Sequence, residues 1–446
     1  MKTKPHPQRI GIVSLGCAKN LVDTERLMKQ LDSNHIELIS NPGPDDRIDA
    51  VIINTCGFIN DAKQESIDTI LQFVDAKKEG KLQQLYVMGC LSERYREQLK
   101  AEIPEVNAFF GVNELQKLVK EVGGTFKKRL LGERFLTTPK HYAYLKIAEG
   151  CDRKCSFCSI PLIRGKHLSR PMEEILSEAK NLVAGGVKEL NVISQDTTYY
   201  GLDLYKKRML PELLKQLAEI PGVRWIRLHY TYPDGFPMET LDIIRENPKI
   251  CNYLDIPLQH ISSSILKSMK RGIDAEGTMS LLEKIREKVP GIAVRSTLIV
   301  GYPGETEKDF RALKDFVTRA RFERLGVFTY SHEEDTAAFG LKDNVPASVK
   351  RRRVDEIMEI QQGISFEINQ EKIGQVFDVL IDRVEGDYFI GRTAFDSPEI
   401  DNEVLIRKPN ADLQTGEIYP VKIFDADAFD LFGEIDLYLQ TKNLEK

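Results

Sequence analysis

The first 140 residues alternate between short apolar runs and longer amphipathic stretches. Three apolar runs have the length of strands: residues 9–15, 50–54 and 85–88. Three stretches that follow them have the apolar spacing of surface helices: residues 21–31, 62–76 and 93–101. Strands that alternate with helices in this way predict a parallel sheet covered by helices, so we expect residues 1–140 to form an α/β sheet domain.

The same rhythm continues over residues 141–346. Candidate strands lie at 144–148, 189–194, 224–229, 253–257, 293–300 and 324–330. Each is followed by a loop and usually by a helical pattern, and six such units predict a full or partial (β/α) barrel.

Residues 347–372 are charged, with apolar positions at helical spacing. They predict a connecting helix packed on the barrel. The alternative is a free basic helix that binds RNA through residues 350–353.

The last segment, residues 373–446, changes character. Alternating apolar and polar residues lie at 376–381, 388–392, 403–406 and 419–424, separated by Gly, Asp, Asn and Pro. Short strands with turn residues between them predict a small all-β barrel. The chain as a whole is therefore of the α/β class, with a small β domain at its end.

The length of the chain is consistent with several domains, and its charge limits the kinds of partner that it can bind. The 446 residues suffice for about three domains. The 63 basic and 68 acidic residues give a net charge of −5, which excludes a basic coat over the whole protein. From residue 375 onward, however, there are 16 acidic and 7 basic residues, so this segment carries −9 and the rest of the chain +4.

No apolar stretch approaches the roughly 18 residues that a membrane helix needs. The start of the sequence also lacks the apolar core of a signal peptide. We therefore expect a soluble cytoplasmic protein that acts neither in a membrane nor on DNA.

The strongest chemical signal is a group of three cysteines, Cys151, Cys155 and Cys158, with the spacing C-x3-C-x2-C. They follow the first predicted barrel strand. Three thiolates on one short loop can hold three irons of a four-iron, four-sulfur cluster and leave the fourth iron open to a small molecule. A closed structural zinc site would need a fourth ligand, for which His167 is the nearby candidate.

Three further cysteines lie directly after predicted strands of the first domain: Cys17, Cys56 and Cys90. Carboxyl ends of parallel strands meet at one edge of a sheet, so these thiols are expected to converge and hold a second cluster. Each of them lies beside a glycine: Gly16, Gly57 and Gly89. These glycines are expected to let backbone approach the cluster closely. Ordinary buried cysteines are the alternative, and Cys251, which has no partner at a ligand spacing, is expected to be one.

The C-x3-C-x2-C loop resembles that of the radical S-adenosylmethionine enzymes. Together with a second cysteine triplet and a terminal β barrel, the whole chain resembles the methylthiotransferases, which combine a cluster domain, a radical barrel and a TRAM domain. The stretches that carry this resemblance are SLGCAKNLVDTERL (14–27), LKIAEGCDRKCSFCSIPLIRGKHLSRP (145–171), ISQDTTYYG (193–201), LHYTYP (228–233), YLDIPLQH (253–260) and RSTLIVGYPGET (295–306). The GCAKNLVD segment is more similar to the ribosomal-protein branch, RimO, than to the tRNA branch, MiaB.

The resemblance implies two 4Fe-4S clusters and S-adenosylmethionine as cofactors. One S-adenosylmethionine methylates a sulfur associated with the N-terminal cluster, and a second yields the radical that removes a substrate hydrogen. The implied product is a methylthio group on the β-carbon of an aspartate in small-subunit ribosomal protein twelve, free or in the ribosome. An electron donor, whose identity the sequence does not give, is also required.

The resemblance also suggests residues beyond the cysteines. Gln195 follows the second barrel strand and Arg295 lies on the fifth, and both are candidate contacts of S-adenosylmethionine. Phe157, between two cysteines, is expected to shield the cluster. Residues 301–304 form a glycine-containing loop at the carboxyl end of a strand, where barrels bind ligands.

Two other functions compete with this one. A tRNA adenosine methylthiotransferase would need a basic terminal domain to grip phosphates, whereas this one is acidic. A non-enzymatic, metal-stabilised RNA-binding module would have closed metal sites, which the open cysteine triplet argues against. An acidic barrel suits a basic ribosomal protein, with Asp425, Asp427 and Asp430 as candidate contacts.

Overall fold

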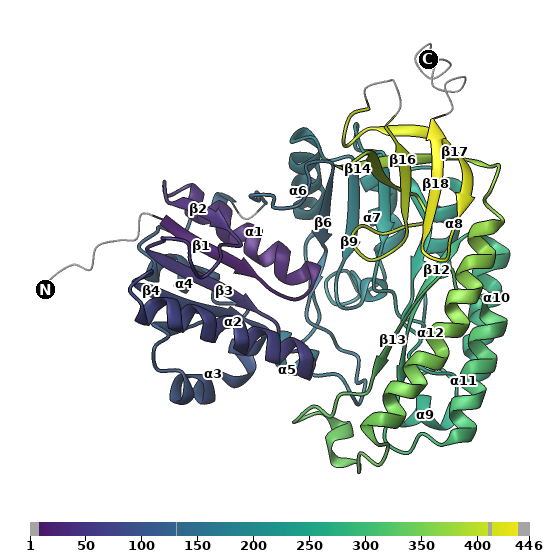
Figure 1. Cartoon of the computed structure of the whole chain (residues 1–446), viewed down its shortest axis with the longest axis horizontal. Helices are drawn as coiled ribbons and strands as arrows, with labels where there is room; N and C mark the ends of the chain where they lie inside the picture. The colour runs from purple at the N-terminus through teal and green to yellow at the C-terminus, as the bar shows by residue number, and fades with distance from the viewer. Residues whose placement is uncertain (1–8, 131, 409–412, 436–446) are drawn as a thin grey trace, which may run out of the picture.

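Residues 9–130, 132–408 and 413–435 are described by a computed structural model of the chain. In Figure 1 the N-terminal sheet, in purple, lies beside the teal and green barrel, and the yellow terminal barrel covers one end of that barrel. The two smaller parts therefore contact different regions of the central one.

The N-terminal part is a five-stranded parallel sheet in the order β2-β1-β3-β4-β5. Its strands are β1 (Arg9–Ser14), β2 (Glu37–Ser40), β3 (Ala50–Thr55), β4 (Gln84–Gly89) and β5 (Ala108–Phe109). Its helices are α1 (Ala18–Asp32), α2 (Asn60–Lys78), α3 (Cys90–Glu102) and α4 (Leu115–Glu121). Every residue of β3 is buried because helices cover both faces of the sheet. The sequence pattern missed β2 and β5, which are short edge strands.

The central part is a six-stranded parallel sheet curved into a partial barrel, in the order β6-β9-β10-β11-β12-β13. Its strands are β6 (Tyr142–Lys146), β9 (Glu189–Ile193), β10 (Trp225–Leu228), β11 (Ile250–Asp255), β12 (Ala293–Val300) and β13 (Arg324–Thr329). The helices between them are α5 (Ile160–Arg164), α6 (Met172–Ala184), α7 (Leu210–Ala218), α8 (Glu239–Glu246), α9 (Ser263–Ser268), α10 (Ala275–Lys288) and α11 (Glu307–Ala320). A small hairpin, β7 (Ala148–Glu149) with β8 (Leu168–Ser169), encloses the cysteine loop.

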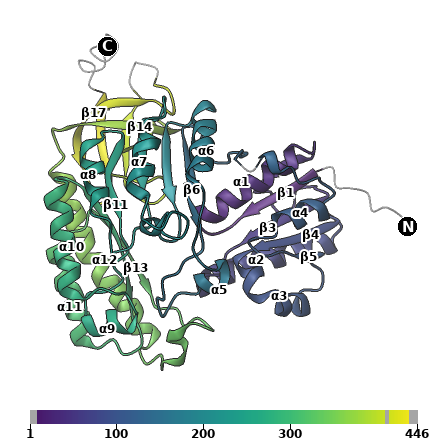
Figure 2. The same ribbon diagram turned by 180° about the vertical axis from the view of Figure 1, so that it is seen from behind.

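Helix α12 (Ala347–Gln370) runs beside α11 and leads from the barrel to the terminal domain, as Figure 2 shows from behind. Ile357 and Ile364 are buried against the barrel. Lys350 and Arg353 are buried as well and pair with Asp343 and Glu305, so they are not presented to RNA. Within the described residues, neither α12 nor any other helix is apolar over a membrane-spanning length.

The terminal part is a closed barrel in the order β14-β15-β16-β18-β17. Its strands are β14 (Val376–Glu385), β15 (Tyr388–Thr393), β16 (Glu403–Arg407), β17 (Ile418–Ala426) and β18 (Asp430–Ile435). The fold class predicted from the sequence is confirmed. Strand β18 was missed, and residues 436–446, assigned to this domain from the sequence, lie outside the described residues.

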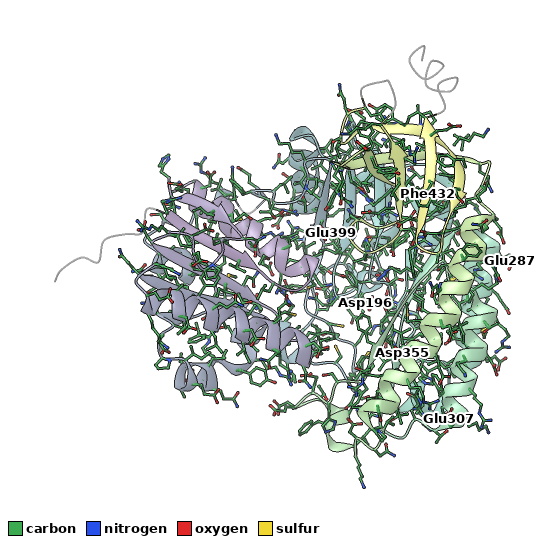
Figure 3. The ribbon with its side chains drawn as sticks, in the orientation of Figure 1. Asp196, Glu287, Glu307, Asp355, Glu399 and Phe432 are labelled. Carbon is green, nitrogen blue, oxygen red and sulfur yellow. The ribbon has the colours of Figure 1, made fainter. Side chains whose placement is uncertain are left out.

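Buried ion pairs fasten the terminal barrel to the amino-terminal ends of the central strands. Arg392 on β15 donates to Glu189 on β9 at 2.7 Å and to Asp382 on β14 at 2.7 Å. Tyr142, at the start of β6, donates to Glu399 at 2.8 Å, and Figure 3 shows Glu399 beneath the terminal barrel. The terminal barrel therefore leaves the opposite, carboxyl end of the central strands uncovered, and this is the end at which such barrels bind ligands.

Replacing Arg392 with methionine is expected to lower the free energy of unfolding by about 3–5 kcal/mol, because Glu189 and Asp382 lose a buried partner. Arg383→Met is the matched control in the same barrel, since Arg383 pairs with Glu403 at the surface and such pairs are worth about 1 kcal/mol or less. Urea unfolding measures both. Equal losses in the two variants would contradict the role of the buried pair.

Candidate functional site

The loop with Cys151, Cys155 and Cys158 lies across the carboxyl end of the central barrel. The Ser156 N–H donates to the Met269 carbonyl at 3.0 Å, and its hydroxyl donates to the Ser268 carbonyl at 2.8 Å. Gly150 opens the loop at φ +67°, and a Cβ there would meet the Lys166 carbonyl oxygen at 2.1 Å, so only glycine fits. These contacts fix the loop between helix α9 and the first barrel strand.

The three thiols of this loop lie close enough to influence one another's ionisation. Burial raises the pKa of Cys151 to about 11 and that of Cys158 to about 12. Metal coordination would remove these protons, because a ligating thiol is deprotonated. The site therefore supplies three converging soft ligands of the kind that iron–sulfur clusters use.

Two arginines place positive charge beside the same loop. Arg271 donates to the Cys155 sulfur at 3.3 Å, and both Arg271 and Arg153 stack on the ring of Tyr232, at 4.2 and 3.8 Å from its centroid. Asp196 holds Arg153 at 2.8 Å and lies near the centre of the molecule in Figure 3. Cations here would balance the negative charge of a thiolate-bound cluster.

The second triplet lies at one edge of the N-terminal sheet. Cys17, Cys56 and Cys90 follow the carboxyl ends of β1, β3 and β4, which are neighbours in the sheet. The thiol of Cys90 interacts electrostatically with those of Cys17 and Cys56. Residues 17, 56 and 90, far apart in sequence, are thus brought together by the parallel topology.

The neighbouring glycines allow the three strand ends to approach one another. A Cβ on Gly16, at φ +85°, would meet the Cys56 Cβ at 2.7 Å, and one on Gly57 would meet the Leu91 N at 2.7 Å. A Cβ on Gly89 would meet the Thr55 carbonyl oxygen at 2.6 Å. These glycines therefore allow the ends of neighbouring strands to approach one another closely. This approach brings the three thiols toward one point.

Ionisation differs among these three thiols. Burial opposes ionisation of Cys17, but the Lys19 ammonium, N–H groups of helix α1 and Arg164 outweigh it and lower its pKa. Burial raises the pKa of Cys56, and raises that of Cys90 to about 12. Cys17 thus has the most electropositive surroundings of the three.

Asn20 joins the second triplet to the barrel. Its amide donates to the carbonyls of Leu15 and Thr55 at 3.0 Å each, which ties the ends of β1 and β3. Its oxygen accepts a hydrogen bond from Arg164, which follows the cysteine loop of the barrel. Arg164 also pairs with Asp23 at 3.1 Å and with Glu149 at 2.8 Å.

The segment 230–232, just after β10, reaches from one triplet to the other. The Tyr230 ring lies 3.3 Å from the Lys19 ammonium, two residues beyond Cys17. The Tyr232 hydroxyl lies 3.5 Å from the Cys155 sulfur. The segment therefore contacts a neighbour of Cys17 through Tyr230 and contacts Cys155 through Tyr232.

The C-x3-C-x2-C loop supplies three cysteines, which is the number of protein ligands that an open four-iron cluster takes. A zinc ion needs its sulfur ligands about 2.3 Å away. No group of three His, Cys, Asp or Glu side chains within the described ranges is arranged for a single ion. In a four-iron cluster each thiolate binds a different iron, so its ligands are spaced more widely. The Nε2 atom of His167 lies 3.1 Å from the Ser169 hydroxyl, and its buried Nδ1 atom has no hydrogen-bond partner among the described residues.

The three residues suggested for cofactor contact have different surroundings. Gln195 donates to Glu149 at 3.4 Å, and its buried Oε1 has no hydrogen-bond partner among the described residues, which fits an absent donor. Phe157 packs against a group of buried hydrophobic side chains that contains Met269 and Tyr302. Arg295 lies 3.7 Å from Asp401 of the terminal barrel, so its charge is already balanced from that side.

Residues 301–304 do not present free N–H groups to a ligand. The N–H groups of Gly301 and Tyr302 both donate to the Glu305 carboxylate, at 2.5 and 3.2 Å. The N–H of Gly304 donates to the Asn344 side chain at 2.9 Å, so the backbone donors of this loop are used by other residues of the chain. Cys251 is buried beside Trp225 and Tyr253, as a structural thiol would be.

Sequence reasoning missed Lys19, Asn20, Arg164 and Tyr232. Lys19 and Asn20 stand within two and three residues of Cys17, and Arg164 lies six residues after Cys158. Proximity to ligand cysteines was the available signal. Their contacts become visible only when the N-terminal sheet is docked on the barrel.

Comparisons with known proteins agree with this arrangement. Family models match three segments of the chain: Radical SAM superfamily over residues 145–317, Uncharacterized protein family UPF0004 over residues 9–111 and TRAM domain over residues 373–435.

Curated relatives match nearly the full chain. A protein of Christiangramia forsetii called ribosomal protein uS12 methylthiotransferase RimO is 57% identical over 435 residues, which cover 97% of this chain and 96% of the relative. A protein of the same name from Bacteroides thetaiotaomicron is 55% identical and covers 96% of this chain and 98% of its own length.

Among solved structures, the radical S-adenosylmethionine methyltransferase TsrM from Kitasatospora setae aligns with a TM-score of 0.53 over 72% of each chain. At 14% identity this likeness shows the fold alone.

Proposed function

The chain belongs to the RimO family of ribosomal protein uS12 methylthiotransferases, and on that premise we propose that it adds a methylthio group to the β-carbon of an aspartate in uS12. The observation that supports the proposal is that the segment 230–232 contacts both Lys19, two residues beyond Cys17, and Cys155. A reaction that combines hydrogen removal with sulfur transfer needs both centres within reach of one substrate carbon. The proposed place of action is the cytoplasm, where ribosomal proteins are found.

The cofactors are two 4Fe-4S clusters and S-adenosylmethionine, which when bound supply the radical and the methylthio group. In the proposal, Cys151, Cys155 and Cys158 hold the radical cluster. The other cluster is held by Cys17, Cys56 and Cys90. The domain bounds proposed from the sequence are residues 1–140 for the N-terminal cluster domain and 141–346 for the radical barrel. Residues 347–372 form the connecting helix, and residues 373–446 form the TRAM domain.

Two side chains support the proposed S-adenosylmethionine site. The unpartnered Oε1 of Gln195 can accept a hydrogen bond from the cofactor, beside the glutamate that precedes Gly150. Phe157 packs against Met269 and Tyr302 beside the cysteine loop, and we propose that it shields the iron–sulfur cluster from water. Arg295 remains a proposed cofactor contact on the sequence resemblance alone, because Asp401 lies 3.7 Å from its guanidinium and balances its charge.

Charge favours a protein substrate over tRNA. The terminal segment carries a net charge of −9, and phosphates would be repelled from it. Some of its carboxylates are already occupied, since Asp382 and Asp396 pair with Arg392 and Arg324. Three that remain exposed lie on the neighbouring strands β14, β17 and β18: Asp378, Asp425 and Glu434.

Reversing Asp378, Asp425 and Glu434 to lysine is expected to weaken the binding of isolated uS12 about tenfold at low salt, because charge complementarity mainly steers association. The difference should shrink at physiological salt, where screening acts beyond about 8 Å. Binding is measured by titration at several salt concentrations, and S-adenosylmethionine cleavage is expected to persist.

The control reverses three exposed carboxylates at the distant ends of N-terminal helices: Asp32, Glu102 and Glu121. Asp427 and Asp430 are left intact, because Asp427 accepts N–H groups of Phe429 and Asp430, and Asp430 accepts that of Glu403. An equal effect of both triple reversals would refute docking on the terminal barrel.

The activity itself is tested with anaerobically reconstituted protein, S-adenosylmethionine, sulfide and a chemical reductant in place of the electron donor. uS12 and unmodified tRNA are supplied together, and mass spectrometry detects the product. We expect a methylthio group on one aspartate of uS12 and none on tRNA. Modification of the tRNA alone would overturn the proposed function.

A further inference from the structure

Lys19 is a buried cation beside the second cysteine triplet. Its side chain belongs to the first turn of α1 and the residue is 8% exposed. Its ammonium lies 3.3 Å from the centroid of the Tyr230 ring and interacts electrostatically with the Cys17 thiol. It therefore lies beside the N-terminal triplet and against the segment that follows β10 in the barrel.

Neighbouring buried cations have carboxylate partners, whereas Lys19 has none in the part of the chain that the structure describes. Lys146 pairs with Asp23 and Glu149, and Arg164 pairs with the same two carboxylates. In place of carboxylates, the Lys19 ammonium has the ring of Tyr230 and the thiol of Cys17 as neighbours. An aromatic face compensates a buried ammonium only in part, so an anion bound here would be stabilised.

The position suits a particular anion. In the proposed reaction, the β-carbon of an aspartate must face the barrel triplet to lose hydrogen, and it must then receive sulfur from the N-terminal side. The carboxylate is one bond from that carbon. A cation beside Cys17 could hold the carboxylate and leave the β-carbon directed toward the segment 230–232.

We propose that Lys19 binds the side-chain carboxylate of the substrate aspartate and thereby makes the enzyme specific for an acidic residue. This inference rests on the proposed function and adds to it the residue that recognises the reacting side chain. Tyr230, whose ring holds the ammonium in place, is a positioning residue in this arrangement. A bound carboxylate would also give Lys19 the carboxylate partner that it lacks among the described residues, whereas its neighbours Lys146 and Arg164 have one.

The test compares Lys19→Met with the unaltered enzyme on two substrates: uS12 and a uS12 variant in which the modified aspartate is asparagine. The unaltered enzyme is expected to have a kcat/KM about a hundredfold higher for the aspartate substrate than for the asparagine substrate. The reason is that asparagine removes the charged partner of a buried ion pair. With Lys19→Met, kcat/KM for the aspartate substrate should fall about a hundredfold and the preference should disappear. Lys19→Arg should retain the preference for aspartate.

Two further measurements separate this role from a structural one. First, Lys19→Met should have unchanged iron and sulfide content and unchanged spectra of both clusters. Second, it should still cleave S-adenosylmethionine, but this cleavage should no longer lead to transfer of a methylthio group. Lys63→Met is the matched control, because Lys63 lies at another contact between the N-terminal sheet and the barrel but pairs with Glu333 at 2.8 Å. It should leave the aspartate preference intact.

The outcomes are distinct. Loss of N-terminal cluster iron in both Lys19→Met and Lys19→Arg would assign Lys19 to the cluster and overturn the inference. A hundredfold preference for aspartate that survives in Lys19→Met would overturn it as well. If the unaltered enzyme modified neither form of uS12, the proposed function itself would fail, whatever Lys19 does.

Discussion

Cys155→Ala is expected to abolish reductive cleavage of S-adenosylmethionine, and with it all methylthio transfer. Cys155 is the central cysteine of the barrel loop, and its sulfur is contacted by Arg271 at 3.3 Å and by the Tyr232 hydroxyl at 3.5 Å. Without it, two thiols remain, and a cluster with an open iron cannot be held in the same way. Formation of 5′-deoxyadenosine under anaerobic reducing conditions should fall to the level of protein without iron.

Cys251→Ala is the control for this loss. Cys251 is buried between Trp225 and Tyr253, away from both triplets in sequence and in contacts. This variant removes a thiol of the same barrel and should keep cleavage and transfer. Persistent 5′-deoxyadenosine in Cys155→Ala, with the protein folded, would contradict the assignment of the loop.

Cys56→Ala is expected to separate the two halves of the reaction. The iron content should fall to about half, since one of two clusters is lost. Cleavage of S-adenosylmethionine should continue because Cys151, Cys155 and Cys158 are untouched, whereas methylthio transfer should stop. Cys17→Ala should give the same result, as both thiols lie at the same edge of the N-terminal sheet.

Iron and sulfide assays, together with the ratio of 5′-deoxyadenosine to methylthiolated product, measure this separation. A Cys56→Ala protein with full iron content would show that the N-terminal triplet holds no cluster. Equal loss of 5′-deoxyadenosine in Cys56→Ala and Cys155→Ala, with both folded, would show that the two triplets do not have separate roles.

The sequence predicted features that depend on local pattern. Runs such as residues 50–54 and 293–300 are long and apolar enough to identify buried strands, and cysteines after such strands follow the rule for parallel sheets. Strand β18 was missed because Gly433 and the acidic residues around it interrupt the apolar alternation. The edge strand β2 is short and only partly buried, so its pattern is weak.

Contacts between domains could not be predicted in the same way. Arg392 and Glu189 are 203 residues apart, and nothing near either residue indicates the other. The same holds for Lys19 and Tyr230, which meet only because the N-terminal sheet docks at the carboxyl end of the barrel. The glycines of residues 301–304 likewise did not indicate that the N–H groups of Gly301 and Tyr302 donate to the Glu305 side chain.

Methylthiolation of an aspartate of uS12 by this chain is tested most directly by mass spectrometry of ribosomal proteins and tRNA from cells that lack its gene. We expect that uS12 from these cells lacks the mass of one methylthio group at a single aspartate and that tRNA is unchanged. The intact gene should restore the modification, whereas a Cys155→Ala copy should not. Unmodified tRNA adenosine in those cells, with uS12 still methylthiolated, would contradict this expectation.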